Sequence, residues 1–257
     1  KAVAFYSNGR GEVPIQKKQS PPADLNWDLF QGPAPRRDYT HDTWNYNWHW
    51  YGWDYSTGET GNNATHELDV ARWALGVDFP EKVMVDSGKY HFVDDGWVMY
   101  DTMDATFKYS DNRTIRWDGR SRNGIDVYGG TGRGTLIFGT EGSVFVDRSH
   151  YKIFDLKGEL IKSVEGNSNE GGNQLGGGGG ISTQHVVNFF DSIRGKTPAN
   201  SPVDEGHKST LMCHLANIAS RTGEVLECNS SNGHITNSEK AMKLWKREYE
   251  KGWEPKI

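Results

Sequence analysis

Hydrophobic and polar residues alternate along the middle of the chain, and this pattern predicts a series of β-strands. A strand turns successive side chains to opposite faces of a sheet, so alternation indicates one buried face and one exposed face. Glycine, asparagine and aspartate fill the short segments between the alternating runs, which is typical of tight turns between antiparallel neighbours. The predicted strands cover residues 2–7, 83–92, 101–109, 114–119, 134–139, 143–147, 152–156 and 160–164.

A different period, with apolar residues three or four positions apart, predicts helices near residue 60 and in the last third of the chain. Gly76 is a natural end for the first long helix, and short strand-like pieces near Val225 and Ile235 separate the last two helices. The segregation of strands and helices along the sequence predicts an α+β fold. The predicted helices cover residues 24–30, 60–75, 183–194, 207–221 and 237–251.

The size and charge of the chain narrow the classes of partner. Its 257 residues suffice for one large domain or two small ones, and ten Trp, eleven Tyr and ten Phe residues can build a core. A net charge of −5 favours neither nucleic acid nor an anionic membrane as a partner, and no apolar run is long enough to span a bilayer. Localisation stays open between the bacterial cytoplasm and periplasm.

Three local features bear on the organisation of the chain. Lys1 already begins a strand, which leads us to expect further sequence upstream. Residues 166–180 contain five consecutive glycines and predict a mobile loop, for which a linker is favoured over a lid. Cys213 falls in an apolar helical pattern and predicts a buried thiol, although a disulfide with Cys228 stays open.

Aromatic residues crowd into positions 44–55 and suggest a sugar site. Their flat faces can stack on the CH faces of a sugar ring. If this segment is extended, Trp48 and Trp50 point to one side and His49 and Tyr51 to the other. One set would then pack inward and the other would face the ligand, and both alternatives stay open.

The helix predicted after this cluster carries a polar stripe. Asn62, His66, Asp69 and Trp73 stand at helical spacing and share one face. His66 titrates near neutrality and is the candidate for accepting a hydroxyl proton. Asp69 could orient the imidazole, bind a hydroxyl, or pair with Arg72 or Arg36. His185, which follows the Gly-rich segment, is a further candidate for the pocket.

Other chemistries find less support in the sequence. The Gly-rich run at residues 129–134 precedes a strand, whereas a dinucleotide loop leads into a helix, so we expect no cofactor to be bound by this chain alone. A zinc site built from His41, His49, His66 and Asp69 would match no standard ligand spacing, so no metal is expected. The sequence contains no nucleophile elbow of the G-x-S-x-G type.

The stretch GNNATHELDVARW, residues 61–73, resembles a helix of the Gfo/Idh/MocA oxidoreductases, the glucose–fructose oxidoreductase and inositol dehydrogenase family. The general pattern of that helix is D-x-G-x-H-x-x-D. Segments 26–33, 46–50, 139–143 and 188–194 are similar to segments of the same family. The resemblance extends over nearly all 257 residues.

This resemblance implies the C-terminal half of a two-domain enzyme. Residues 1–257 would form a single α+β domain for substrate binding and oligomerisation, with a large, mostly antiparallel or mixed open sheet and helices packed on one face. The N-terminal Rossmann domain, with its E-K-P lysine, would bind NAD or NADP in the full-length protein. The open sheet face would join copies of the chain into a homo-oligomer.

The resemblance also implies roles for individual residues. His66 corresponds to the family histidine, which exchanges a proton with a sugar or polyol substrate. Asn62 stands where the family has an aspartate and cannot act as an acid or base, so His66 is left as the main candidate. Without the cofactor domain the chain is expected to be inactive. Two alternatives stay open: a stand-alone carbohydrate-binding module, and a cofactor-independent lyase or hydrolase acting on (keto)glycosides.

Overall fold

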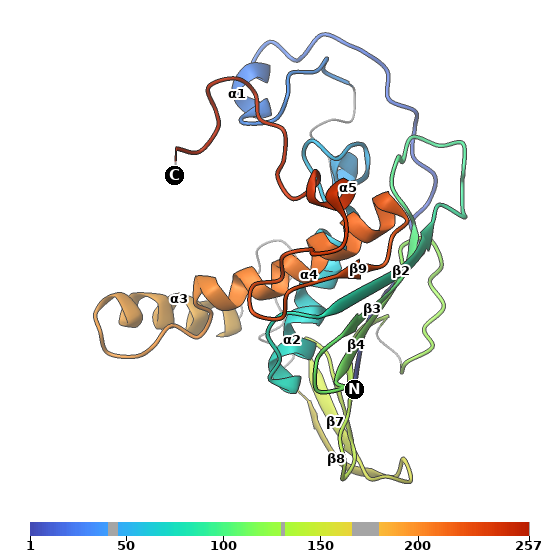
Figure 1. The fold of residues 1–257 in the computed structure, drawn as a ribbon, viewed down its shortest axis with the longest axis vertical. Helices are drawn as coiled ribbons and strands as arrows, with labels where there is room; N and C mark the ends of the chain where they lie inside the picture. Colours follow the sequence, from blue (N-terminus) through green and yellow to red (C-terminus); the bar gives the residue numbers. More distant parts are fainter. Residues whose placement is uncertain (41–45, 130–131, 166–179, 257) are drawn as a thin grey trace.

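Nine strands form one open sheet in the computed structural model (Figure 1). The structure describes residues 1–40, 46–129, 132–165 and 180–256. The predicted Gly-rich loop lies outside the described residues except for its last position. In spatial order the strands are β8 (Leu160–Glu165), β7 (His150–Phe154), β6 (Ser143–Val146), β5 (Arg133–Phe138), β1 (Ala2–Ser7), β4 (Thr114–Arg120), β3 (Thr102–Lys108), β2 (Lys82–Gly88) and β9 (Leu226–Glu227).

The sheet is mixed because one pair of neighbours is parallel. β1 runs parallel to β4 and antiparallel to β5, and the other neighbours are antiparallel. This arrangement confirms the predicted α+β class with a large open sheet. β2 ends at Gly88, earlier than predicted, because the chain then makes an excursion and returns at Asp101, whose N–H donates to the carbonyl oxygen of Gly88.

Helices of several lengths accompany the sheet. The long ones are α2 (Thr65–Leu75), α3 (Gly180–Ile193) and α4 (Val203–Thr222). The short ones are α1 (Trp27–Gln31) and α5 (Glu239–Met242), together with a 3₁₀ turn, η1 (Tyr46–Trp50), and a π-helical turn, η2 (Thr60–Ala64). α2 ends as predicted at Gly76, whose φ of 61° is the left-handed conformation that glycine adopts freely. Within the described ranges, no helix combines the length and apolar character that crossing a membrane requires.

The helix predicted at residues 237–251 was wrong in length. Ser238 caps α5, but the bonds from Leu244 and Trp245 reach back only three residues, which tightens and ends the helix. Beyond that point the Trp245 ring packs 4.5 Å from the ring of His234. Tertiary contacts of this kind override the helical period. α1 begins three residues later than predicted because Asn26 caps it at Trp27, and it ends at Gln31, before Gly32 at φ 53°.

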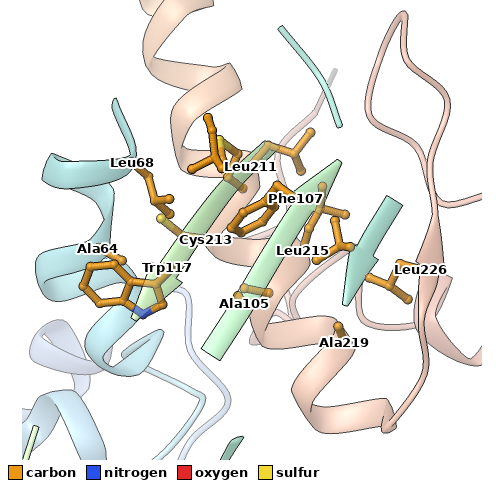
Figure 2. Close-up of a cluster of buried hydrophobic side chains, with 14 of the residues drawn as sticks. Ala64, Leu68, Ala105, Phe107, Trp117, Leu211, Cys213, Leu215, Ala219 and Leu226 are labelled. Atoms are coloured by element: carbon orange, nitrogen blue, oxygen red, sulfur yellow. The ribbon is translucent and has the colours of Figure 1, made fainter. Parts of the chain in front are cut away.

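The main core lies between the sheet and two helices. α2 packs on β1 and β5, and α4 packs on β2 (Figure 1). Figure 2 shows Leu68 of α2 and Leu215 of α4 near Phe107 of β3 and Trp117 of β4, all of which are fully buried. Each such side chain contributes roughly 1.5–3 kcal/mol when it leaves water. A second buried cluster joins the aromatic segment to the excursion after β2 and consists of Val13, Trp50, Tyr51, Trp97 and Met99.

Both cysteines are expected to resist alkylation in the folded chain. Cys213 and Cys228 are buried free thiols, and burial raises the pKa of Cys213 to about 12 and that of Cys228 to about 11. The reactive thiolate is therefore scarce at pH 8 as well as inaccessible. Mass spectrometry after iodoacetamide treatment should find no modified cysteine in the native chain and two after unfolding in urea. Rapid labelling of either thiol under native conditions would contradict this burial.

Candidate functional site

The N-terminal entry to α2 is held in an unusual backbone conformation by a buried network. The Thr60 hydroxyl donates to Asn217 Oδ1 at 2.9 Å, and the Tyr100 hydroxyl donates to the same oxygen at 2.8 Å. Asn217 Nδ2 in turn donates to the carbonyl oxygen of Thr57 at 2.7 Å. These hydrogen bonds join the region of the π-helical turn η2 to Asn217 of α4 and to Tyr100, which precedes β3. Such turns are frequent at functional sites because they displace side chains from the regular helical face.

This turn directs Asn62 toward a buried carboxylate. Glu59 is 1% exposed and accepts from Asn63, from Asn62 Nδ2 at 3.3 Å and from the Ser121 hydroxyl at 2.7 Å. Asn62 Nδ2 also lies 3.1 Å from the Tyr46 hydroxyl. Asn62 thus fixes the aromatic segment against the start of α2, a task for which an amide suffices.

The aromatic segment forms the 3₁₀ turn η1 and not the extended strand on which the two-sided arrangement depended. Trp50 is fully buried and stacks on Trp97 at 4.5 Å with an interplanar angle of 10°. Tyr51 is likewise buried. Trp48 and His49 are half-buried and stack on each other at 4.0 Å. The structure thus divides the four predicted residues into two core residues and two that solvent reaches.

An arginine that was not predicted from the sequence packs against these aromatic rings. The Arg10 guanidinium lies 4.6 Å from the ring centroid of Trp50 and 5.3 Å from that of Tyr46. Its Nη2 donates to the Tyr6 hydroxyl at 3.1 Å, and its Nε lies 3.6 Å from Glu59. Arg10 is far from α2 in sequence, and only the pairing of β1 within the sheet brings it to the site.

His66 is exposed on α2, on the same helical face as the exposed Asp69 and Trp73, as the spacing predicts. Asp69, however, accepts from the Ser209 hydroxyl at 2.5 Å and lies 4.0 Å from Arg72. Of the alternatives for Asp69, the structure therefore shows the pairing with Arg72, and it adds a bond to α4.

A buried ion pair underlies His66 and was also missed from the sequence. Arg133 on β5 donates from Nε and Nη2 to Glu67 Oε1 at 2.9 and 2.7 Å, and from Nη1 to Asn63 Oδ1 at 3.3 Å. Burial raises the pKa of Glu67, although the charge of Arg133 acts in the opposite direction. The partners stand 66 residues apart, so no local pattern could have shown their contact.

The imidazole of His66 is biased toward its neutral form. Partial desolvation of the ring lowers its pKa, the guanidinium groups of Arg148 and Arg133 lower it further, and Asp69 acts in the opposite direction. A neutral imidazole at pH 7 can accept a proton from a hydroxyl group.

Removing one of these positive charges should raise the pKa of His66. The change Arg148→Gln removes a guanidinium that disfavours the imidazolium ion, so the midpoint should move upward. Titration of the His66 ring signals by NMR in both proteins measures the shift directly. Arg194→Gln, at an exposed position directly after α3, is the control and should leave the midpoint unchanged. A midpoint that stays or falls in the Arg148 variant contradicts the electrostatic account.

Neither His185 nor the cavity beside α4 belongs to the group of residues around His66. His185 is exposed on α3, which extends away from the sheet in Figure 1, and no hydrogen bond or ring contact joins it to His66 in the described structure. A cavity of about 810 Å³ lies along the outer face of α4, between Trp53 and Trp245, and none of the predicted site residues lines it. Among the described residues, no group of three or more His, Cys, Asp or Glu side chains could hold a metal ion.

Comparison with protein families decides the classification. Residues 3–170 match the model described as "Oxidoreductase family, C-terminal alpha/beta domain", which is the C-terminal domain of the Gfo/Idh/MocA proteins. The chain belongs to this family. The matched range contains α2 with His66, β1 from its second residue, and the strands from β2 to β8. A search of curated proteins found no match.

Solved oxidoreductase structures share the fold of this Gfo/Idh/MocA chain. Aldose-aldose oxidoreductase from Caulobacter crescentus, complexed with glycerol, is 13% identical with a TM-score of 0.56, over 88% of this chain and 54% of that one. The WlbA dehydrogenase from Bordetella pertussis, in complex with NADH and UDP-GlcNAcA, is 14% identical with a TM-score of 0.53, over 89% and 55%. An NAD binding oxidoreductase from Klebsiella pneumoniae is 14% identical with a TM-score of 0.52, over 88% and 58%. The chain thus spans about half the length of these structures.

Proposed function

We propose that this chain is the substrate-binding and oligomerisation domain, residues 1–257, of an NAD(P)-dependent sugar or polyol oxidoreductase. In this proposal His66 exchanges the proton of the substrate hydroxyl. The observation that carries it is an exposed imidazole, held toward its neutral form, on the family helix of an oxidoreductase domain. Relatives of the same fold are described with NADH and a nucleotide sugar, or with glycerol.

The Gly-rich run at residues 129–134 does not support a dinucleotide loop. Its described residue Gly132 leads directly into β5, which begins at Arg133, and not into a helix N-terminus whose dipole could face a pyrophosphate. In our proposal another domain of a longer protein holds the cofactor. The contribution of this chain is to bind and orient the sugar and to take up its proton at one ring nitrogen of His66.

The half-buried aromatic residues beside η2 suit the sugar-binding role. Trp48 and His49 are half-buried, and Tyr46 is 42% exposed with its hydroxyl beside Asn62. Ring faces of this kind pack against the CH faces of a pyranose, while the Tyr46 hydroxyl can bond to a sugar hydroxyl. Trp50 and Tyr51 support these residues from the core, so we assign them no ligand contact.

Binding experiments on the chain test this function. Glucose and myo-inositol at millimolar concentration should shift the NMR signals of His66 and of the Trp48 indole, and the change His66→Ala should weaken the shifts. NADH should show no saturable binding to this chain. Saturable NADH binding would contradict the proposal that another domain holds the cofactor. Turnover of a 3-keto-glycoside without added cofactor, abolished in the His66 variant, would instead favour a lyase or hydrolase.

We also expect copies of the chain to associate through the open sheet face. The edge strand β8 exposes the apolar side chains of Leu160 and Ile161, Phe138 is exposed at the end of β5, and exposed apolar groups commonly mark interfaces. Light scattering at micromolar concentration should give at least twice the 28.9 kDa mass of the chain. The change Ile161→Lys should reduce the mass toward that of a monomer. A monomer before any substitution contradicts this expectation.

A further inference from the structure

We propose that α3 is a docking helix whose apolar face packs against the cofactor-binding domain of the longer oxidoreductase. This inference rests on the proposed function, which places the cofactor in another domain, and it names the surface at which the two domains meet. Five large apolar side chains of α3 have exposed fractions between 47% and 67%: Val186, Val187, Phe189, Phe190 and Ile193.

The spacing of these residues gives α3 one apolar face. Four of the five stand at i, i+3, i+4 and i+7 along the helix, counted from Val186. This is the stripe that an amphipathic helix normally turns toward a core or lays into the groove of a partner. The rings of Phe189 and Phe190 lie with their centroids 5.6 Å apart, so the exposed apolar surface is continuous. Contiguous apolar surface on a folded protein marks an interaction site.

The polar face of α3, and not its apolar face, is joined to the rest of the chain. Asn188 Nδ2 donates to the carbonyl oxygen of Pro198 at 3.0 Å, and Asn188 Oδ1 accepts from the backbone N–H of Asn200 at 2.9 Å. Asp191 Oδ1 lies 3.2 Å from Lys196 Nζ. These contacts hold α3 against the connection to α4 and leave its apolar side chains in water, on a helix that extends away from the sheet (Figure 1).

The chain itself does not supply a cover for this face. Among the described residues, no other helix or strand packs extensively on α3. Residues 166–179 directly precede α3 and lie outside the described ranges, and their sequence contains one large apolar residue, Leu175. One such side chain is too small to cover five. The match to three solved relatives covers only between 54% and 58% of their length, so a protein of that length has further structure that can cover α3.

A dinucleotide-binding domain is the partner that fits both the surface and the proposed function. In that function the sugar lies on this chain and the nicotinamide lies on the other domain. The two reacting groups meet only if the domains are held in a fixed geometry. Permanent contacts are built on apolar side chains, whereas transient ones are more polar. The apolar face of α3 has the composition of a permanent contact.

Hydrogen exchange measured by mass spectrometry tests the inference. Amide exchange of peptides covering residues 183–193 is compared in this chain alone and in the longer oxidoreductase. Exchange should be about tenfold slower in the longer protein, because docking protects the helix. The change Phe190→Asp should remove that protection. Leu156→Asp, at an exposed position in the turn before β8, is the matched control and should retain it.

Thermal unfolding of the same variant separates docking from packing within the chain. Phe190→Asp should leave the unfolding temperature of this chain unchanged, because the side chain is already 47% exposed, and should lower that of the longer protein. A lower unfolding temperature in this chain alone shows that the ring packs within the domain and overturns the inference.

The remaining outcomes separate this inference from the proposed function. Equal exchange of α3 in the chain and in the longer protein overturns the docking assignment, and oxidation of a sugar by that protein leaves the proposed function standing. A longer protein that binds neither NAD nor NADP overturns both. Protection in the chain alone that grows with protein concentration assigns α3 to a second copy. Protection by vesicles of phosphatidylcholine and phosphatidylserine, but not by the longer protein, assigns α3 to a membrane. Either assignment overturns the inference.

Discussion

Replacing Arg122 by leucine is expected to lower the free energy of unfolding by about 3–5 kcal/mol. The side chains of Arg122 and Asp95 are fully buried and form an ion pair. Arg122 Nη1 also donates to the carbonyl oxygen of His91 at 2.9 Å, and the guanidinium lies 3.8 Å from the ring centroid of Trp97. Leucine fills part of the space but leaves the carboxylate of Asp95 in the interior with Lys89 as its remaining cationic partner. Urea unfolding followed by circular dichroism measures the loss.

A matched substitution at an exposed ion pair provides the control. Arg116 pairs with Asp104 on neighbouring strands, and their side chains are 38% and 40% exposed. The change Arg116→Leu should cost less than about 1 kcal/mol, because water screens the pair and solvates whichever partner remains. Similar losses in the two variants would show that burial does not decide the strength of these contacts and would refute the account of Arg122.

The effect should extend to the aromatic segment. The carboxylate of Asp95 accepts from the backbone N–H groups of Val13 and Trp97, and the Trp97 ring stacks on the Trp50 ring. The Arg122–Asp95 pair therefore joins the N-terminal excursion, the loop after β2 and the end of β4. Loosening this ion pair should broaden the NMR signals of the Trp48 indole near the candidate site. A loss of stability confined to the packing around α4 would not have this effect.

The alternation of polar and apolar residues was sufficient to predict the sheet. In β3 the buried side chains Met103, Ala105 and Phe107 alternate with half-buried or exposed ones, and the neighbouring strand repeats the pattern. The period of two follows directly from the geometry of a strand with one covered face. The same logic predicted α2, where Leu68 and Ala71 are fully buried.

Local patterns could not predict structure that distant contacts determine. The turn at Tyr46–Trp50 depends on the stack between Trp50 and Trp97, and α5 ends where Trp245 meets His234. Both contacts reach beyond a strand or helix period, so the local pattern left the arrangement of the first segment open and predicted too long a helix for the second. The parallel pairing of β1 with β4 is likewise a property of topology and not of either strand alone.

In the candidate site too, local patterns predicted some residues and distant contacts determine the others. The helical spacing correctly placed His66, Asp69 and Trp73 on one face, because all three belong to one element. The buried cation beneath that face comes from another element, and Arg133 reaches it only through the pairing of β5 with β1. A buried carboxylate directly after the histidine is the one local signal that could have prompted a search for a buried cation.

The change His66→Ala should lower kcat/KM of the longer oxidoreductase by about 10²–10⁴-fold, if our proposed function holds. The imidazole is the exposed group on the family helix that is biased toward neutrality, and the neighbouring carboxylate of Asp69 is engaged with α4. The loss should fall on kcat more than on KM, since a proton acceptor contributes most in the transition state. Steady-state oxidation of the preferred sugar with NAD or NADP measures both parameters.

The pH profile distinguishes loss of a proton acceptor from loss of structure. In the unsubstituted protein the acid limb of kcat/KM should lie below the ordinary imidazole pKa, because desolvation, Arg148 and Arg133 lower the pKa of His66. In His66→Ala that limb should disappear. His214→Ala is the control, since His214 is exposed on the outer face of α4 beside a separate cavity, and it should keep both the rate and the limb. An unchanged acid limb in the His66 variant would assign the proton transfer to another group, whatever the fall in rate.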